Sequence, residues 1–262
     1  MYTKDHILRM LFLDIETARY HKDYEELSEG MKKMWELKAQ NIDNKEQTLS
    51  IAEKYYDRAA IYAEFARVIC ISVGFIYERN GEMFLRTKSF FGANEKHILE
   101  DFRDFIDEKS ELSNDKFKIQ KTNSSHKFNY LVAHNGKEFD FPFLGRRFLV
   151  NQLKLPLALE LRGKKPWEIH HLIDTMELWK FGDSKNFTKL ELLCNIFDIP
   201  TPKDDIDGSQ VGEVFWKDED YERIAVYCEK DVIATAQLIL KYNLLPLIPE
   251  SHIQFTERKT LL

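Results

Sequence analysis

The sequence predicts a mixed α/β fold, in which one sheet is flanked by helices. Apolar runs of strand length, such as residues 68–77, recur along the chain and are rich in β-branched residues. Several of these runs are separated by stretches with helical spacing, which is typical of strands connected through helices. We found neither an internal repeat nor a linker. We therefore expect a single domain over residues 1–262.

The first predicted strand covers residues 6–16 and ends in two acidic residues. Residues 18–66 then change character and predict a helical insertion after this strand. Leu27, Met31, Met34 and Leu37 fall on one helical face, and a second stripe lies within 49–62.

Two further strands, 67–77 and 82–91, are joined at Asn80-Gly81, a strong hairpin signal. Asn94 can cap a helix that runs to residue 106. The remaining expected elements, in order, are a loop at 109–127, a strand at 130–135, a helix at 141–153, a strand at 169–178, a short helix at 188–197, a loop at 201–215 and a long helix at 218–242. Residues 250–262 are left as a tail.

The charge balance argues against one class of function. The formal net charge is −6 and the pI is about 5.8, whereas proteins that coat duplex DNA carry a basic excess. A nuclease stays possible, because a metal site made of carboxylates adds acidic residues.

The cysteines and the N-terminus bear on the compartment. Cys70, Cys194 and Cys228 are odd in number and form no CxxC pair, which predicts neither disulfides nor a cysteine-based zinc site. We see no secretory signal and no apolar run near the roughly 18 residues of a membrane span. The sequence predicts a cytoplasmic protein without membrane contact.

Asp14 and Glu16 break the apolar pattern of the first strand. Strand side chains alternate, so both carboxylates point to the same face. Two such anions at the edge of a core are costly unless a positive charge lies between them. A salt bridge to Arg or Lys and a divalent cation both satisfy this requirement.

Two later motifs add carboxylates. Asp140 follows a strand within "NGKEFD" at the start of a helix, and Tyr227 and Asp231 lie four residues apart on one helical face. A DxE or YxxxD is common by chance, whereas NxxxFD arises in about one chain of this length in thirty. Taken singly, Asp140 and Asp231 can also be ordinary helix carboxylates and Tyr227 a core aromatic.

The order of "LFLDIET", "AHNGKEFDFPFL" and "YCEKDV" resembles the DEDD exonuclease superfamily, in its branch with tyrosine in the third motif. It is most similar to the stand-alone bacterial family described as predicted 3′–5′ exonucleases related to the proofreading domain of B-family DNA polymerases. The segments around 164–183 and 202–216 also resemble that family. The resemblance covers about residues 7–248.

The resemblance implies a ribonuclease-H-like fold and a 3′–5′ exonuclease that releases nucleoside 5′-monophosphates from single-stranded DNA. Two divalent cations, Mg²⁺ or Mn²⁺, would be held by Asp14, Glu16, Asp140 and Asp231. Tyr227 would orient the attacking water, since a tyrosine pKa near 10 makes it a poor base.

Three further residues are implied to contact the nucleic acid. Asn135 and Phe139 would line the groove for the single strand, and Thr17 would offer its backbone to the terminal nucleotide. The structural alternatives are a turn-forming Asn135 and a core Phe139. An exoribonuclease with the same site and a non-catalytic nucleic-acid-binding adaptor are the competing functions.

Other polar residues near the motifs have structural alternatives too. His134 favours a structural role, and Asp174 lies either near the site or at a strand-end hydrogen bond. Cys228 is expected to pack away from any metal. Four lysines of the insertion, which favour a solvated helix face over a grip on phosphates, are Lys22, Lys32, Lys33 and Lys38.

Overall fold

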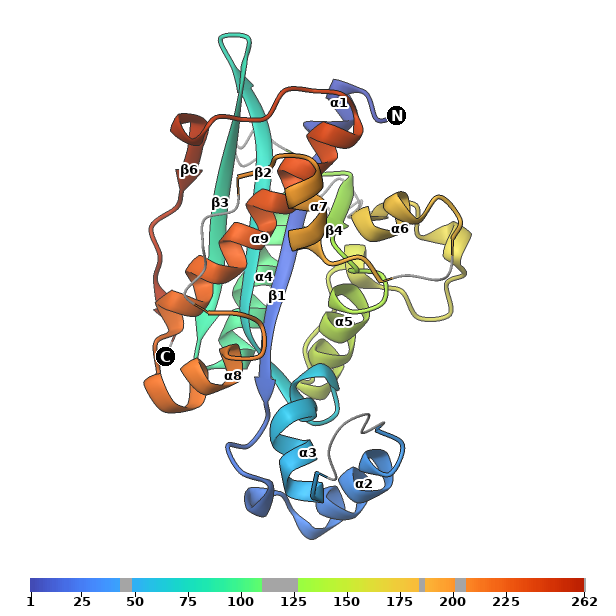
Figure 1. Ribbon diagram of the computed structural model, residues 1–262, viewed down its shortest axis with the longest axis vertical. Helices are drawn as coiled ribbons and strands as arrows, with labels where there is room; N and C mark the ends of the chain where they lie inside the picture. Colours follow the sequence, from blue (N-terminus) through green and yellow to red (C-terminus); the bar gives the residue numbers. More distant parts are fainter. Residues whose placement is uncertain (43–48, 110–126, 184–186, 201–205, 262) are drawn as a thin grey trace.

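The computed structural model describes residues 1–42, 49–109, 127–183, 187–200 and 206–261 (Figure 1). Within these residues the strands form one seven-stranded mixed sheet in the order β5-β4-β1-β2-β3-β6, with β7 also beside β3. The strands are β1 (Met10–Arg19), β2 (Ala66–Arg79), β3 (Glu82–Gly92), β4 (Tyr130–Ala133), β5 (Leu172–Asp174), β6 (Ile253–Phe255) and β7 (Thr260–Leu261). The predicted mixed α/β class is confirmed.

The sheet combines both strand directions around β1. β1 pairs antiparallel with β2 and parallel with β4, which pairs parallel with β5. On the other side, β2 pairs antiparallel with β3. The β1–β2 register shifts between Glu16 and Thr17, where Ile69 is the extra residue of β2. Such a bulge bends the strand next to the acidic pair.

Helices cover both faces of the sheet. The helices are α1 (Lys4–Ile7), α2 (Glu29–Ala39), α3 (Ile51–Arg58), α4 (Glu95–Lys109), α5 (Asp140–Val150), α6 (Thr175–Lys180), α7 (Leu190–Ile196), α8 (Val211–Glu213) and α9 (Tyr221–Tyr242). Figure 1 shows α9 crossing one face and α4 on the opposite face. Among the described residues, none of the helices has the length and apolar character needed to cross a bilayer.

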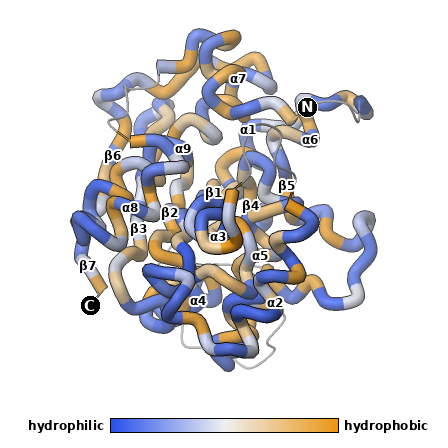
Figure 2. Tube along the Cα trace, turned by 60° about the horizontal axis from the view of Figure 1, so that its bottom comes forward, coloured by the Kyte–Doolittle hydropathy of each residue, from blue (hydrophilic) through white to orange (hydrophobic). Residues whose placement is uncertain are grey.

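β1 is buried on both faces because its residues alternate between two cores. Leu11, Leu13 and Ile15 pack with residues of α4 and α5. Met10 and Phe12 pack with residues of α9. Figure 2 shows β1 near the middle of the molecule, with hydrophilic and hydrophobic residues interleaved along the surrounding segments.

The hairpin and the helix cap expected from the sequence are both present. Asn80 and Gly81 have φ values of 55° and 81°, the left-handed conformation that a tight two-residue hairpin requires. The side chain of Asn94 accepts a hydrogen bond from the His97 amide (3.2 Å) at the start of α4.

The insertion contains two helices, as expected, and Leu27 and Met31 of the predicted face pack in its core, but the other half of that face is wrong. Met34 and Leu37 are about half exposed (47% and 51%), whereas Trp35 and Ala39 are buried. Trp35 packs edge-on against Tyr55 of α3, with ring centroids 5.4 Å apart. An aromatic core between α2 and α3 therefore sets the buried face.

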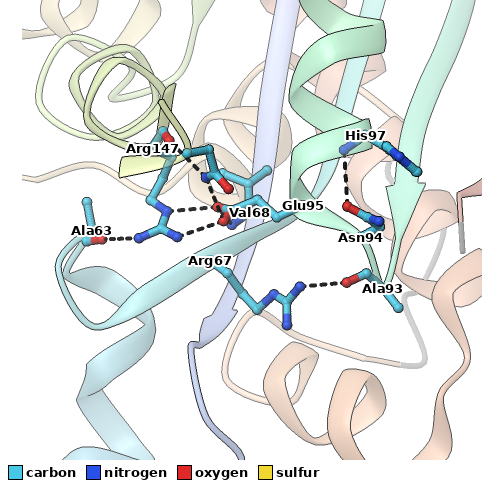
Figure 3. Close-up of polar contacts among 9 residues, drawn as sticks. Ala63, Arg67, Val68, Ala93, Asn94, Glu95, His97 and Arg147 are labelled. Atoms are coloured by element: carbon cyan, nitrogen blue, oxygen red, sulfur yellow. Dashed lines mark hydrogen bonds and ion pairs between the residues drawn. The ribbon is translucent and has the colours of Figure 1, made fainter. Parts of the chain in front are cut away.

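A buried ion pair ties this region to the sheet (Figure 3). The Arg147 guanidinium of α5 donates to both oxygens of Glu95 (2.8 and 2.6 Å) and to the Ala63 carbonyl (2.8 Å). Glu95 also accepts from the Val68 amide (2.8 Å) and from Asn151 (2.9 Å). The Glu95 carboxylate thus links α4, α5 and β2. Arg147 also bonds to Ala63, near the end of the insertion.

Other expectations need correction or lie outside the described residues. The loop expected at 201–215 is wrong from residue 211, where α8 and a π-helical turn, Val214–Asp218, begin; residues 201–205 lie outside the described ranges. Most of the loop expected at 109–127 also falls outside them. The 250–262 tail supplies β6 and β7, which run parallel to β3.

Candidate active site

Asp14 and Glu16 lie on the face of β1 that α9 covers. Met10 and Phe12 precede them on this face, and Ala18 follows them in a second apolar cluster. Both carboxylates are partly buried. The alternation of the strand therefore places two anions side by side within apolar packing.

Asp140 reaches the same part of β1 from α5. It is the first residue of that helix and is 3% exposed. Its Oδ1 accepts a hydrogen bond from the Ile15 amide (3.2 Å), which lies between Asp14 and Glu16 in the chain. The third predicted carboxylate is thus held at the acidic pair.

The turn that delivers Asp140 depends on a glycine and on Asp174. A Cβ on Gly136 would lie 2.4 Å from the Ala133 Cβ, so no other residue fits there without a shift. Asp174, at the end of β5, accepts hydrogen bonds from the backbone amides of Asn135 (2.9 Å) and Lys137 (3.1 Å). Asp174 therefore makes the strand-end bonds that were one of its two expected roles.

His134 has the structural role that the sequence favoured. Its ring nitrogens lie 2.8 Å from the Thr175 hydroxyl and 2.8 Å from the Thr188 carbonyl. Burial lowers the pKa of this imidazole, which keeps it neutral. It joins the end of β4 to the chain around α6.

α9 supplies the last two predicted residues. Tyr227 and Asp231 lie one turn apart, and both are partly exposed. The negative charge of Asp231 acts on Asp14, Glu16 and Asp140. A Cβ built on Gly208 would lie 3.8 Å from the Tyr227 hydroxyl, so the loop before α8 reaches this residue.

The carboxylates raise one another's pKa. Burial is the largest cause at Asp14 and Glu16, followed by the charge of Asp231, and both pKa values lie well above the ordinary range. Burial raises the pKa of Asp140 to about 7, with further contributions from Asp174 and Asp231. Four anionic side chains therefore share one electrostatic environment in which full ionisation is unfavourable.

Cys228 is buried in an apolar cluster, as expected, but its thiol faces the acidic pair rather than away from it. Its thiol donates to Asp14 Oδ2 (3.2 Å) and to the Asp14 carbonyl (3.4 Å). One ligand atom each from Asp14, Glu16 and Cys228 lie within 4.8 Å of one another. The sequence contained a pattern that predicts this position of Cys228: Cys228 and Asp231 have i, i+3 spacing, and such residues share a helical face.

The three residues expected to contact nucleic acid lie next to the motif carboxylates in the chain, with Thr17 following Glu16 and Phe139 preceding Asp140. The Thr17 hydroxyl donates to the Ala60 carbonyl (2.8 Å), and Thr17 pairs with Val68 in the β1–β2 ladder. Phe139 is partly buried against the core on the α4–α5 side of the sheet. Asn135 has a left-handed backbone (φ 62°), and its buried Oδ1 accepts no hydrogen bond from the described residues.

Two of the four insertion lysines have side-chain partners within the insertion. Lys32 lies 3.2 Å from Glu29, and Lys38 lies over the Tyr62 ring, 4.0 Å from its centroid. These contacts agree with the solvated helix face that the sequence favoured.

The donor set fits hard divalent cations. Asp14, Glu16, Asp140 and Asp231 offer only oxygen atoms, which Mg²⁺ and Mn²⁺ prefer. In the part of the chain that the structure describes, no lysine or arginine forms a salt bridge with Asp14, Glu16 or Asp140. The sequence offers two explanations for the acidic pair, a salt bridge and a divalent cation. The salt bridge is not observed among these residues.

The comparison with solved structures establishes the fold. The family B DNA polymerase from the hyperthermophilic archaeon Pyrobaculum calidifontis is similar over 90% of this chain, with a TM-score of 0.53 and 15% identity. The similarity spans only 24% of the polymerase chain. At this identity it concerns the fold alone, and it confirms the expected ribonuclease-H-like fold.

The comparison with protein families is more specific. No curated protein matches the chain. A family described as "Predicted 3'-5' exonuclease related to the exonuclease domain of PolB" matches residues 61–247, well over half of the chain. This range includes Asp140, Tyr227 and Asp231 but starts after β1, so Asp14 and Glu16 lie outside it. The chain belongs to this family of predicted 3′–5′ exonucleases.

Proposed function

We propose that this protein is a divalent-metal-dependent 3′–5′ exonuclease that releases nucleoside 5′-monophosphates from the 3′ end of single-stranded DNA. The observation that carries the proposal is the convergence of Asp14, Glu16 and Asp140 at one point of β1, with Asp231 close enough to raise the pKa of all three. A site that only bound phosphates would gain nothing from this concentration of negative charge.

The four carboxylates would hold the cations. Two bound Mg²⁺ or Mn²⁺ ions would lower the pKa of a water molecule and neutralise charge on the leaving 3′-oxygen. Asp14 is the central ligand of this proposal, since the Cys228 thiol donates to one of its oxygens and an oxygen of Glu16 lies within 4.8 Å. Asp140 has one oxygen fixed by the Ile15 amide, so its orientation is set before any ion binds.

Tyr227 would orient the attacking water. It lies one helical turn before Asp231, so both side chains point from α9 toward the face of β1 that carries the acidic pair. The hydroxyl would act by hydrogen bonding, because a phenol is a weak base at neutral pH.

The terminal nucleotides would lie along the rim of the site. Asn135 would contact a terminal nucleotide, since its Oδ1 has no hydrogen-bond partner among the described residues, and Phe139 would stack on a base with the face of its ring. Thr17 would contribute backbone atoms, since its hydroxyl is bonded to Ala60. Because base stacking tolerates any sequence, this arrangement suits a nuclease without sequence preference.

We also propose a single domain in a reducing, cytoplasmic compartment. Cys70, Cys194 and Cys228 are all free and buried, which fits a compartment where thiols stay reduced. The insertion 18–66 and the tail 250–262 both pair with or bond to the common sheet.

The test uses the purified protein with 5′-labelled single strands of DNA and of RNA, each with Mg²⁺, Mn²⁺ or chelator. A ladder that shortens from the 3′ end only with metal is the expected result, and the DNA strand should be shortened faster. Faster shortening of RNA would replace the DNA assignment with an exoribonuclease. Binding without cleavage, from folded protein with either metal, would favour the adaptor.

Two variants make this test specific. Asp14→Asn removes the central carboxylate without changing its size and should abolish the ladder. Asp104→Asn is the matched control, since Asp104 is an exposed carboxylate on α4, on the opposite face of the sheet. Equal activity of the two variants would contradict the proposed site.

A further inference from the structure

The segment that follows α9 runs beside β3 and returns to the start of α9. β6 pairs with residues 85–87 of β3, and β7 pairs with residues 91–92. Figure 1 shows this segment passing along the outer edge of the sheet toward the first turns of α9. It lies outside the range that the family matches, and no element was expected there from the sequence.

Arg258, between these two strands, forms an ion pair with the centre of the third motif. Its guanidinium donates to Glu229 Oε2 through two nitrogens (2.6 and 3.2 Å). Glu229 is fully buried, so this pair is desolvated on the side of the carboxylate. Arg258 also lies 3.7 Å from Glu222, two helical turns earlier on α9. One arginine thus contacts α9 at two levels.

Glu229 continues the contact into the sheet. Its second oxygen, Oε1, accepts a hydrogen bond from the Ser89 hydroxyl of β3 (2.7 Å). Ser89 in turn lies 2.8 Å from the Ser72 hydroxyl of β2, and Ser72 is the residue paired with Asp14 across the β1–β2 ladder. A chain of short polar contacts therefore runs from Arg258 to the strand position opposite Asp14.

The position of Glu229 in the helix gives these contacts a consequence for the site. It lies two residues after Tyr227 and two before Asp231. Successive helical residues are separated by about 100° around the axis. Fixing the Glu229 side chain on the sheet therefore also fixes the rotation of α9, which decides where Tyr227 and Asp231 point.

We propose that Arg258 is a positioning residue of the metal site. By pairing with Glu229 it holds α9 in the rotation that brings Tyr227 and Asp231 to Asp14 and Glu16. This inference rests on the proposed function where it concerns turnover, but it makes a separate claim about cation binding, which can be measured without a substrate.

The decisive variant is the double substitution Glu229→Gln with Arg258→Gln. It removes the ion pair, leaves no buried charge unpaired (Glu222, which also loses Arg258, is exposed) and keeps the net charge of the protein, so the overall electrostatic attraction of cations is unchanged. Mn²⁺ binding is measured by titration calorimetry on protein whose circular dichroism shows it to be folded. We expect an affinity about tenfold weaker than that of the wild type and a lower kcat with KM changed less than twofold.

Two further variants separate positioning from general stability. Gln254→Ala breaks the contacts of the same segment to Tyr77 and Arg86 and removes no polar contact with the described residues of α9, so it should lower Tm and keep the Mn²⁺ affinity within twofold. Arg258→Lys keeps the positive charge and should restore most of the affinity.

Several outcomes would overturn the inference. They are wild-type Mn²⁺ affinity in the folded double variant, an equal loss of affinity in Gln254→Ala, and a wild type that binds no Mn²⁺. A wild type that binds Mn²⁺ and cleaves neither DNA nor RNA would overturn only the proposed function, because the affinity comparison among the variants would still stand.

Discussion

Two groups of buried carboxylates in this molecule are built in opposite ways. Glu95 has both oxygens occupied by Arg147 and further hydrogen bonds from Val68 and Asn151 (Figure 3). Asp14, by contrast, has other carboxylates and one weak thiol donor around it, and its pKa is raised well above the ordinary range. The folded chain supplies Glu95 with a cation at both oxygens. The described residues supply no such cation to Asp14.

The comparison teaches how stability and function are distributed. A buried carboxylate with a partner on every side fixes the elements that bring it those partners. Carboxylates such as Asp14 and Glu16, which lie beside other carboxylates and form no salt bridge with a lysine or arginine among the described residues, destabilise the fold and persist only where something else is gained. We therefore expect substitutions in the first group to affect stability and substitutions in the second to affect turnover.

The largest expected effect is on turnover by Asp14→Ala. Removing this carboxylate should lower kcat by at least about a thousandfold, because stabilising the charge at the reacting phosphate usually contributes most to the rate of such reactions. Unfolding by urea should show equal or greater stability, since one repulsive anion is lost. Ordinary turnover in this variant would contradict the proposed site, and a strongly destabilised protein would contradict the comparison.

Arg147→Ala should produce the opposite pattern. It leaves Glu95 buried without its cation, which typically costs about 3–5 kcal/mol. Urea denaturation measures this loss. The matched control is Arg103→Ala, which breaks an exposed pair with Asp104 and should cost less than about 1 kcal/mol. Similar losses in the two variants would show that the buried pair contributes no more than a surface pair.

Tyr227→Phe should have a smaller effect on turnover than the loss of Asp14. We expect kcat to fall about ten- to a hundredfold while the affinity for a single strand stays nearly constant, since only one hydrogen bond to water is removed. Rapid-quench assays and fluorescence anisotropy with chelator measure the two quantities. An unchanged kcat would mean that another group orients the water.

The pH dependence of stability gives a further test of the unfavourable negative charge at the carboxylate cluster. The folded-state pKa of Asp140 is about 7, above the value of an unfolded chain, so the folded state retains the proton longer. Stability without metal should be greatest at low pH and should decrease by about 2 kcal/mol as the pH rises from 5 to 8. Millimolar Mg²⁺ should reverse most of this loss.

Thermal unfolding with and without chelator across this pH range measures the effect. The Asp140→Asn variant supplies the control, because it removes the titration of Asp140 and should reduce the slope of the curve recorded without metal. A slope that is unchanged in this variant would assign the pH dependence to other carboxylates of the cluster.

The core of the site was predictable because its residues follow strong local patterns. The alternation of β1 placed Asp14 and Glu16 on one face, and the i, i+4 spacing on α9 did the same for Tyr227 and Asp231. The turn between β2 and β3 was predictable for a similar reason, since Asn-Gly accepts positive φ.

The remaining features depend on contacts between distant parts of the chain. β6 has three residues and β7 has two, too few to show any periodicity, and their pairing with β3 is set by the path of the chain after α9. Part of the buried face of α2 was missed because its Trp35, outside the expected stripe, packs on Tyr55. Cys228 was missed because its neighbour across the site, Asp14, lies more than 200 residues away in the chain.

The β2–β3 hairpin offers an attachment point for single-molecule experiments. Its tip, residues 78–82, is exposed and projects from one end of the molecule in Figure 1. Arg79 lies seven residues along β2 from Ser72, the partner of Asp14, which is about 24 Å of extended strand. Since Cys70, Cys194 and Cys228 are all buried, Arg79→Cys would create a readily accessible thiol for a fluorophore or a surface tether. The protein could then be immobilised by an end of the molecule that lies far from Asp14.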